Sequence, residues 1–150
     1  MPIKLVTPGR QIKADFTTQY DERVRRVVLN TLQYVGESCI TEARNNGNYI
    51  DRTGNLRSSI GYVVVNNGII VTQGNSQKYL EGTLGETNGV KFVRDLAARN
   101  NKGMVLIVAA GMNYAVYVEA RGYNVLTSAE LLADSLVPQM LRAIGFTIKK

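Results

Sequence analysis

The stretch "IGYVVVNNGIIVTQG", residues 60–74, decides the fold that this chain is expected to adopt. Two runs rich in β-branched side chains flank an Asn-Asn-Gly sequence at residues 66–68. β-Branched residues suit extended backbone, and an Asn-Gly pair supplies the positive φ angles that a two-residue hairpin turn requires. The pattern therefore predicts a β-hairpin.

The sequence "YIDRTGNLRSS", residues 49–59, comes directly before the hairpin and has the composition of a chemical site. A phosphate-binding P-loop, however, needs the spacing G-x-x-x-x-G-K-[ST] between a strand and a helix. No lysine follows the glycines here, and a strand is expected next. A nucleophile at Ser58 or Ser59 would need a neighbouring base, and the chain contains no histidine. Both chemical interpretations are therefore disfavoured.

A structural interpretation of the same stretch follows from its residue types. Thr53-Gly54 is expected to form a turn that releases the chain from a preceding helix, because glycine adopts positive φ without strain. Leu56 and Ile60 are expected to be apolar anchors. Ser58 and Ser59 are expected to make local hydrogen bonds where the strand begins.

Upstream of this turn, apolar residues recur at steps of three and four over residues 17–46. This spacing predicts a long amphipathic helix, capped by Thr17 or Thr18 and ended by the Asn-Asn-Gly sequence at 45–47. Residues 1–15 contain two prolines and little periodicity, and we expect them to form an N-terminal arm.

Downstream of the hairpin, residues 74–90 contain many glycines and few large apolar side chains, which predicts a long exposed loop. A short helix is expected over residues 90–101. The continuous apolar run at 103–111 predicts a central strand, and the alternation in "NYAVYVEARG", residues 113–122, predicts another strand.

The last element expected is an amphipathic helix over residues 127–145. Thr127 and Glu130 have the spacing of a capping box, and Pro138 is expected to kink or break the helix. Together these elements predict an α+β fold with about four mostly antiparallel strands and helices on one face. We expect an arm at 1–15 followed by a single domain over 16–150.

Composition narrows the classes of function. The chain has 150 residues, a formal net charge of +6 and one cysteine. Cys39 alone cannot form an internal disulfide, and no apolar run approaches the roughly 18 residues that a membrane helix needs. We expect a soluble protein from a reducing compartment, without a signal peptide. The positive charge is compatible with nucleic acid or an acidic partner, but the basic residues are spread along the chain.

Enzymatic chemistry finds little support in the sequence. The absence of histidine removes the commonest acid-base and metal-binding group. Carboxylates are present, but none shows the spacing of a metal site or an acid-base pair. We therefore expect a binding or structural role, with no catalytic residue, cofactor or metal.

Two motifs in order resemble a known family. The sequence "TGNLRSSI" and, about fifty-five residues later, "NYAVYVEARG" resemble the neck and tail-completion proteins of long-tailed bacteriophages. That family typically has a long N-terminal helix, T-G-x-L-x-x-S-I, a hairpin, Y-A-x-Y-V-E-x-G and a C-terminal helix. The matching positions are Thr53, Gly54, Leu56, Ser59, Ile60, Tyr114, Ala115, Tyr117, Val118, Glu119 and Gly122.

The resemblance implies a structural virion protein that is not an enzyme. Family members form homo-oligomeric rings, most often of six, around the channel through which DNA passes. They are assembled in the host cytoplasm and contact head-closure and tail proteins, with no membrane involved. Basic residues in or beside the expected exposed loops, Arg57, Lys78 and Lys91, are candidates for non-specific contact with DNA or for an interface.

A second hypothesis is a small basic nucleic-acid-binding protein. The pI near 9.6 and the 8 tyrosines favour it, because basic patches with aromatic side chains suit nucleic acid. The more ordinary interpretation of both features is a solvated basic surface and a sheet face rich in tyrosine.

Overall fold

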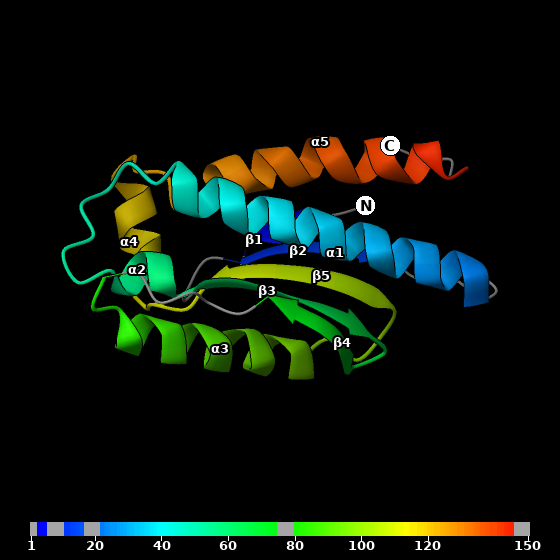
Figure 1. The fold of residues 1–150 in the computed structure, drawn as a ribbon, viewed down its shortest axis with the longest axis horizontal. Helices are drawn as coiled ribbons and strands as arrows, with labels where there is room; N and C mark the ends of the chain where they lie inside the picture. Colours follow the sequence, from blue (N-terminus) through cyan, green and yellow to red (C-terminus); the bar gives the residue numbers. More distant parts are fainter. Residues whose placement is uncertain (1–2, 6–10, 17–21, 75–79, 146–150) are drawn as a thin grey trace.

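The computed structural model describes residues 3–5, 11–16, 22–74 and 80–145 (Figure 1). Those residues contain five strands and five helices. In chain order the elements are β1 (Ile3–Leu5), β2 (Gln11–Phe16), α1 (Glu22–Asn45), α2 (Asn55–Ser58), β3 (Ile60–Asn66), β4 (Ile69–Gly74), α3 (Thr83–Ala98), β5 (Met104–Ala110), α4 (Ala115–Ala120) and α5 (Thr127–Ala143).

The strands form one sheet in the order β1-β2-β5-β3-β4, and every neighbouring pair is antiparallel. β5 is central: Ile107 lies opposite Lys13 of β2 on one side and Val63 of β3 on the other. The expected hairpin is confirmed, since β3 and β4 are joined through Asn67 (φ 51°) and Gly68 (φ 84°). The positive φ angles at both positions explain why the sequence has Asn-Gly there.

Helices cover both faces of this sheet: α1 and α5 lie on one face and α3 lies on the other (Figure 1). The alternation in β3 shows this division, because Tyr62 and Val64 belong to the cluster with α1 and α5, whereas Val63 and Val65 belong to the cluster with α3. All seven residues of β5 are buried. The α+β class is confirmed. The expectation of about four strands with helices on one face is corrected to five strands between two helical layers.

α1 and α5 pack as antiparallel neighbours along the sheet (Figure 1). The thiol of Cys39 in α1 donates a hydrogen bond of 3.5 Å to the carbonyl oxygen of Ala129 in α5. Both residues are fully buried. Burial raises the pKa of the Cys39 thiol to about 12, and the charge of Glu42 adds to this effect.

Tyr62 of β3 occupies a narrow slot lined by glycines. A Cβ added at Gly36 of α1 or at Gly74 of β4 would lie only 2.4 or 2.0 Å from its ring. The hydroxyl of Tyr62 donates to Oε1 of Glu37 at 2.7 Å. These two glycines therefore allow a large aromatic ring to sit between α1 and the edge of the sheet.

The expected loop at 74–90 is wrong over its second half, because α3 begins at Thr83. The glycines mark close packing of α3 instead of an open loop. An added Cβ at Gly82 would lie 2.5 Å from the Gly54 carbonyl oxygen, and one at Gly85 would lie 1.9 Å from the Asn55 carbonyl oxygen. The described part of the expected loop is thus mostly a helix whose backbone approaches α2.

The N-terminal arm expected at 1–15 is also corrected, because its described residues form strands. β2 lies along β5, with Gln11 opposite Ala109 and Phe16 opposite Met104, and β1 pairs with β2. The proposed helix caps, Thr17 and Thr18, and the basic residue Lys78 lie outside the described residues.

The strand expected at 113–122 is wrong, because this segment forms the short helix α4. Ala115 and Glu119, one helical turn apart, are its buried residues. The start of α5 also differs from the capping box expected at Thr127 and Glu130, because Thr127 is already the first residue of the helix. The first residue before α5, Leu126, makes no side-chain cap, and the hydroxyl of Thr127 donates to Glu119 instead. α5 continues through Pro138 to Ala143.

Candidate functional site

The two motif segments, which are far apart in sequence, meet at one end of the molecule. α2 and α4 lie there together with the loop after α1 and the beginnings of α3 and α5 (Figure 1). The amide of Gly111 donates to the Ser59 carbonyl oxygen at 3.1 Å, which links the chain before α4 to the chain after α2. We call residues 44–59 and 111–128 the motif corner.

The first motif is organised by a carboxylate that the sequence reasoning missed. Oδ2 of Asp51 accepts a hydrogen bond from the Arg57 amide at 2.9 Å, and Oδ1 accepts one from the Leu56 amide at 3.4 Å. These contacts satisfy amides at the start of α2. Gly54 has φ 77°, so the turn expected at Thr53-Gly54 is confirmed. Thr53 Oγ1 accepts from the Asn55 amide at 3.3 Å.

Arg57, expected at DNA or an interface, points inward. Its Nη2 donates to the Gly47 carbonyl oxygen at 2.6 Å and its Nε donates to the Arg44 carbonyl oxygen at 3.4 Å. Its guanidinium also lies 4.7 Å from the ring centre of Tyr49. Arg57 therefore ties α2 to the carbonyl groups at the end of α1, and its geometry supports a structural role.

The carboxylate of the second motif fixes the start of α5. Glu119 is only 9% exposed. Its Oε1 accepts from the Leu126 amide at 3.1 Å and from the Thr127 hydroxyl. A negative charge there also suits the positive end of the helix dipole. The nearby Gly122 has φ 91°, so the glycine of the motif allows the chain to turn after α4.

Within the motif corner, Asn124 connects the loop after α1 to the start of α5. Its amide N–H donates to Asn48 Oδ1 at 2.7 Å, and its side-chain Nδ2 donates to the Asn46 carbonyl oxygen at 3.1 Å. Its Oδ1 accepts from the Ser128 amide at 3.0 Å, in the first turn of α5. The loop after α1 is therefore held against the beginning of α5 by one side chain.

The serines of the first motif are placed for structure. Ser58 and Ser59 are fully buried, and the Ser59 hydroxyl donates to the Leu56 carbonyl oxygen at 2.7 Å. Leu56 and Ile60 are core residues, as expected for anchors, and Ala115 of the second motif joins the same core. A buried serine held by its own turn cannot meet a substrate from solvent.

The outer surface of the motif corner is rich in exposed tyrosine and aliphatic side chains. Ile50 is 86% exposed, Tyr117 is 70% exposed, and Tyr114 and Tyr123 are also exposed. Leu131 of α5, just outside the corner, is 65% exposed. An open depression of about 360 Å³ lies beside them, lined by residues between Glu119 and Leu131. Tyrosine and exposed apolar side chains are typical of protein interfaces.

A basic end lies opposite the motif corner. The first turns of α1 carry Arg23, Arg25 and Arg26, and the last turn of α5 carries Arg142. Because α1 and α5 are antiparallel, these two helix ends lie together (Figure 1). Arginines at the N-terminus of a helix are disfavoured by its dipole, so a bound anion would suit this end. Lys91 is exposed on α3, away from these arginines.

Asp51, Tyr49, Asn124 and the basic end are the features that the sequence interpretation missed. Asp51 stands shortly before Gly54 and α2, which is the position of a capping residue. The arginine cluster is visible as "ERVRR", but the sequence interpretation described the basic residues only as spread along the chain. Nothing in the sequence indicated that Asn124 contacts residues 46 and 48.

Comparisons with known proteins assign no family: no protein-family model, no curated protein and no solved structure matches this chain. Among the described residues, no group of three or more His, Cys, Asp or Glu could hold a metal ion. No described helix has both the length and the hydropathy needed to cross a bilayer.

Proposed function

We propose that this chain is a structural subunit of the head–tail junction of a long-tailed bacteriophage. In this proposal, copies of the chain form a ring, of six subunits as in the family it resembles, between the head-closure complex and the tail. The observation that carries the proposal is the meeting of both motif segments in one corner, where residues in and beside the motifs hold the end of α1 and the starts of α2 and α5. Motif residues that bind helix ends in this way support the fold of a protein and not a reaction centre.

The surfaces of the molecule support assembly. The motif corner presents Tyr114, Tyr117 and Tyr123 to solvent beside Ile50, whereas its hydrogen-bonding groups are directed inward. An exposed aromatic surface on a rigid support suits a protein partner, because little conformational entropy is lost when it binds. A head-closure or tail protein is the partner class that the resemblance implies.

The basic end supports contact with DNA in a channel. Arg23 and Arg26 are exposed, Arg25 is half-buried, and Arg142 is exposed at the end of the neighbouring helix. Repetition around a ring would multiply this charge. Phosphate contacts of this kind position DNA without reading its sequence. These arginines replace Arg57 as the preferred DNA-facing residues, and Lys91 remains an additional candidate on α3.

The direct test is made in a phage that carries this gene. Disruption of the gene is expected to yield DNA-filled heads and separate tails by electron microscopy, and a plasmid copy is expected to restore joined particles. Mass spectrometry of purified virions is expected to detect the chain. Normal particles without the chain would overturn the proposal.

The nucleic-acid-binding alternative is favoured by one observation, the arginine cluster at the basic end. It predicts that the isolated protein binds duplex DNA and that the logarithm of affinity falls steeply with the logarithm of salt concentration. The double variant Arg23→Gln, Arg26→Gln should reduce both the affinity for duplex DNA and the steepness with which that affinity falls with salt. Arg52→Gln at the motif corner should change neither quantity. Tight binding by a monomer that is absent from virions would favour this alternative over the neck proposal.

A further inference from the structure

Three asparagine-glycine pairs occur in this chain, at residues 46–47, 67–68 and 88–89. The backbone nitrogen of the residue after an asparagine can attack the side-chain carboxamide carbon, and glycine hinders this attack least because it has no Cβ. The attack requires an amide that is not held by a hydrogen bond and a peptide group that can rotate. The three pairs differ in both respects.

The pair at 88–89 lies inside α3. An α-helix hydrogen-bonds each interior amide to the carbonyl oxygen four residues earlier, so the Gly89 amide is engaged. Nδ2 of Asn88 donates to Sδ of Met112 at 3.8 Å. A Cβ added at Gly111 would lie only 2.7 Å from the Asn88 carbonyl oxygen. Attack at Asn88 would therefore require α3 to unwind in a tightly packed place.

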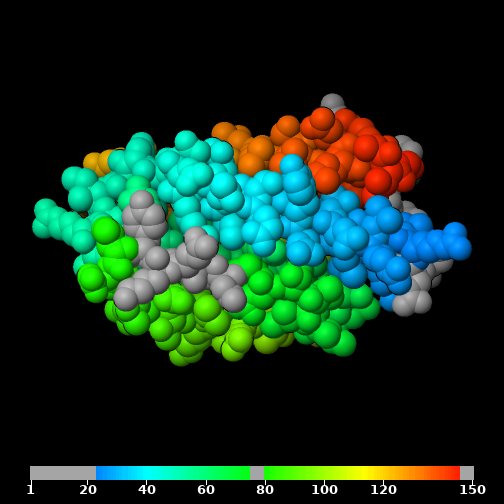
Figure 2. Space-filling model, in the orientation of Figure 1, coloured from blue at the N-terminus to red at the C-terminus, as the bar shows by residue number. Residues whose placement is uncertain are grey.

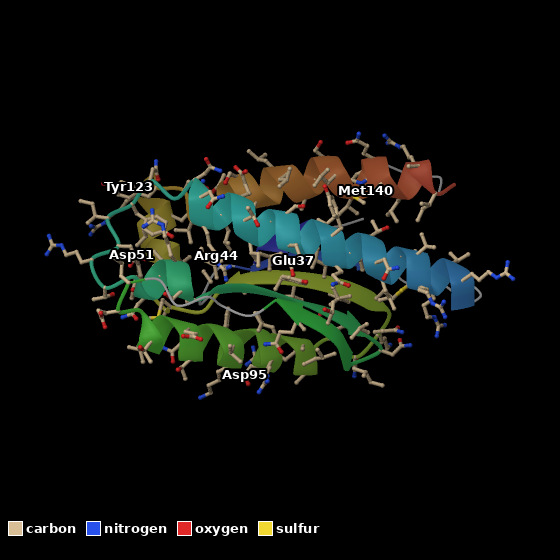
Figure 3. All side chains as sticks on the ribbon, viewed as in Figure 1. Glu37, Arg44, Asp51, Asp95, Tyr123 and Met140 are labelled. Carbon is tan, nitrogen blue, oxygen red and sulfur yellow. The ribbon has the colours of Figure 1, made fainter. Side chains whose placement is uncertain are left out.

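The pair at 46–47 lies in the motif corner, at the end of the molecule that Asp51 marks in Figure 3. Its peptide group is held on both sides. The Asn46 carbonyl oxygen accepts a hydrogen bond from Nδ2 of Asn124 at 3.1 Å. The Gly47 carbonyl oxygen accepts one from Nη2 of Arg57 at 2.6 Å. Rotation of this peptide would break contacts that hold the corner together.

The pair at 67–68 forms the tip of the hairpin, between the paired residues Asn66 and Ile69. Asn67 is exposed. Among the described residues, neither the Asn67 carbonyl oxygen nor the Gly68 amide makes a hydrogen bond. The peptide between these two residues can therefore rotate without the loss of any hydrogen bond that the structure describes.

The backbone of Gly103 holds the carboxamide of Asn67 in place. The Asn67 amide donates to the Gly103 carbonyl oxygen at 2.9 Å, and Oδ1 of Asn67 accepts from the Gly103 amide at 2.8 Å. Attack on the carboxamide carbon places negative charge on this Oδ1 atom. A donor that already points at the oxygen stabilises that charge. The contact with Gly103 therefore favours the attack.

We propose that Asn67 is a self-modification site, at which asparagine is converted into aspartate and isoaspartate with water as the only co-reactant. The Gly68 nitrogen loses its proton to solvent and forms a bond to Cγ of Asn67. The bond from Cγ to Nδ2 breaks, and ammonia leaves after it takes up a proton. Water then opens the cyclic imide at either carbonyl and returns a proton to the nitrogen, so that no electrons are gained or lost.

The products change the basic end of the molecule. The hairpin tip lies at the same end as the start of α1 (Figure 1), and Figure 2 shows the green atoms of the hairpin at the surface below the blue atoms of α1. Each conversion adds a negative charge beside Gly103, which follows the exposed Lys102. Isoaspartate also adds a carbon to the main chain, which disturbs the two-residue turn. The positive charge of this end thus falls as the molecule ages.

Peptide mapping of aged protein tests the site. The folded chain is incubated in mildly alkaline buffer and digested, and mass spectrometry detects each amide that has become a carboxylate. We expect conversion at Asn67 to be at least about tenfold faster than at Asn46 or Asn88, because the last two must first lose hydrogen bonds. Conversion of either residue as fast as Asn67 would overturn the proposal.

Two controls separate the effect of the fold from that of the sequence. In denaturant the hydrogen bonds of the fold are lost, and the three pairs should convert at similar rates. Asn101 is exposed, and its Cα would lie 3.4 Å from a Cβ added at Gly68. Because Asn101 precedes a lysine, it should stay unconverted in the folded chain. Selectivity for Asn67 that persists in denaturant would overturn the proposal, as would equal conversion of Asn101.

The charge of the intact protein gives a second test. On ion exchange, the aged chain is expected to separate into the original form and a more acidic form. Asn67→Gly, which keeps a residue suited to the turn, should greatly slow the appearance of the acidic form. Asn46→Gly is the matched control and should age like the unaltered chain. Circular dichroism verifies that both variants fold. Equal rates for the two variants would contradict the proposal.

Discussion

The motif corner and the β4 edge make opposite use of their polar groups. In the corner, Asp51, Arg57, Glu119 and Asn124 each satisfy backbone groups at helix ends. Along β4, the outer row of backbone groups has no neighbouring strand among the described residues. The comparison indicates that the corner holds the fold together, whereas the edge can change without loss of the fold.

The largest expected effect comes from a clash in the corner. Gly85→Ala places a Cβ 1.9 Å from the Asn55 carbonyl oxygen, and we expect it to lower the free energy of unfolding by about 3 kcal/mol. Ile69→Ser on the β4 edge is expected to change it by less than about 0.5 kcal/mol. Urea denaturation followed by circular dichroism measures both. Equal losses would remove the distinction between the two regions.

Gly122→Ala measures the cost of a positive φ at a position where the added Cβ causes no steric clash. Unlike Gly85, this glycine has a positive φ, 91°, and an added Cβ would meet nothing within 4 Å. We expect a loss of about 1 kcal/mol from conformation alone. A loss as large as that of Gly85→Ala would show that a positive φ alone can cost as much as the steric contact at Gly85.

The second effect concerns the inward arginine. Arg57→Met removes the hydrogen bonds to the carbonyl oxygens of Arg44 and Gly47 and the charge over Tyr49. We expect a loss of about 2 kcal/mol in the free energy of unfolding, with DNA affinity unchanged. Arg52→Met, at an exposed neighbour, is the control and should leave stability within about 0.5 kcal/mol. Lost DNA affinity with full stability would return Arg57 to the DNA-facing set.

The third effect is local to the start of α5. Glu119→Gln keeps an oxygen acceptor for the Leu126 amide but removes the negative charge near the helix N-terminus. We expect a loss of about 1 kcal/mol and faster amide hydrogen exchange in the first turn of α5. Exchange in α3 should be unchanged, because the hydrogen bonds of this carboxylate go to Leu126 and Thr127 at the start of α5.

The smallest expected effect is a gain, and not a loss, in the free energy of unfolding. The Tyr49 hydroxyl is buried and has no hydrogen-bond partner among the described residues. Tyr49→Phe should therefore leave stability at pH 7 unchanged or raise it by up to about 1 kcal/mol. A clear loss would reveal a partner for this hydroxyl.

The same variant should alter stability at high pH. Burial raises the pKa of Tyr49 and of Tyr62, and Glu37 adds to the shift at Tyr62. An unfolded tyrosine titrates near pH 10, so the unfolded state loses its phenolic protons before the folded state does. Stability is then complete below about pH 9 and falls as pH rises through about 10. Tyr49→Phe should make this fall shallower.

The sequence predicted those parts of the fold that short-range patterns determine. The hairpin was correct because its turn requires positive φ at two positions and Asn67 and Gly68 adopt it at low cost. The strand at 104–110 was correct because its continuous apolar run is buried on both faces. Gly54 was recognised as a turn for the same conformational reason. The α+β class followed from these elements together.

The errors lie where tertiary contacts decide the structure. Gly82 and Gly85 resembled loop residues, although they are small because α2 lies against them. Residues 113–122 alternate like a strand, but Ala115 and Glu119 also share one face of a helix, and their packing favours that helix. β2 was missed despite the alternation in "QIKADF", because its partner β5 is far away in sequence.

The same distances in sequence affect how the protein is made on the ribosome. Cys39 and Ala129, which meet between α1 and α5, are 90 residues apart. At typical rates of synthesis, about 5–20 residues per second, the apolar stripe of α1 is synthesised roughly 5–18 seconds before the helix that covers it. During that interval the nascent chain needs protection from aggregation, which a chaperone that binds exposed apolar helices would supply.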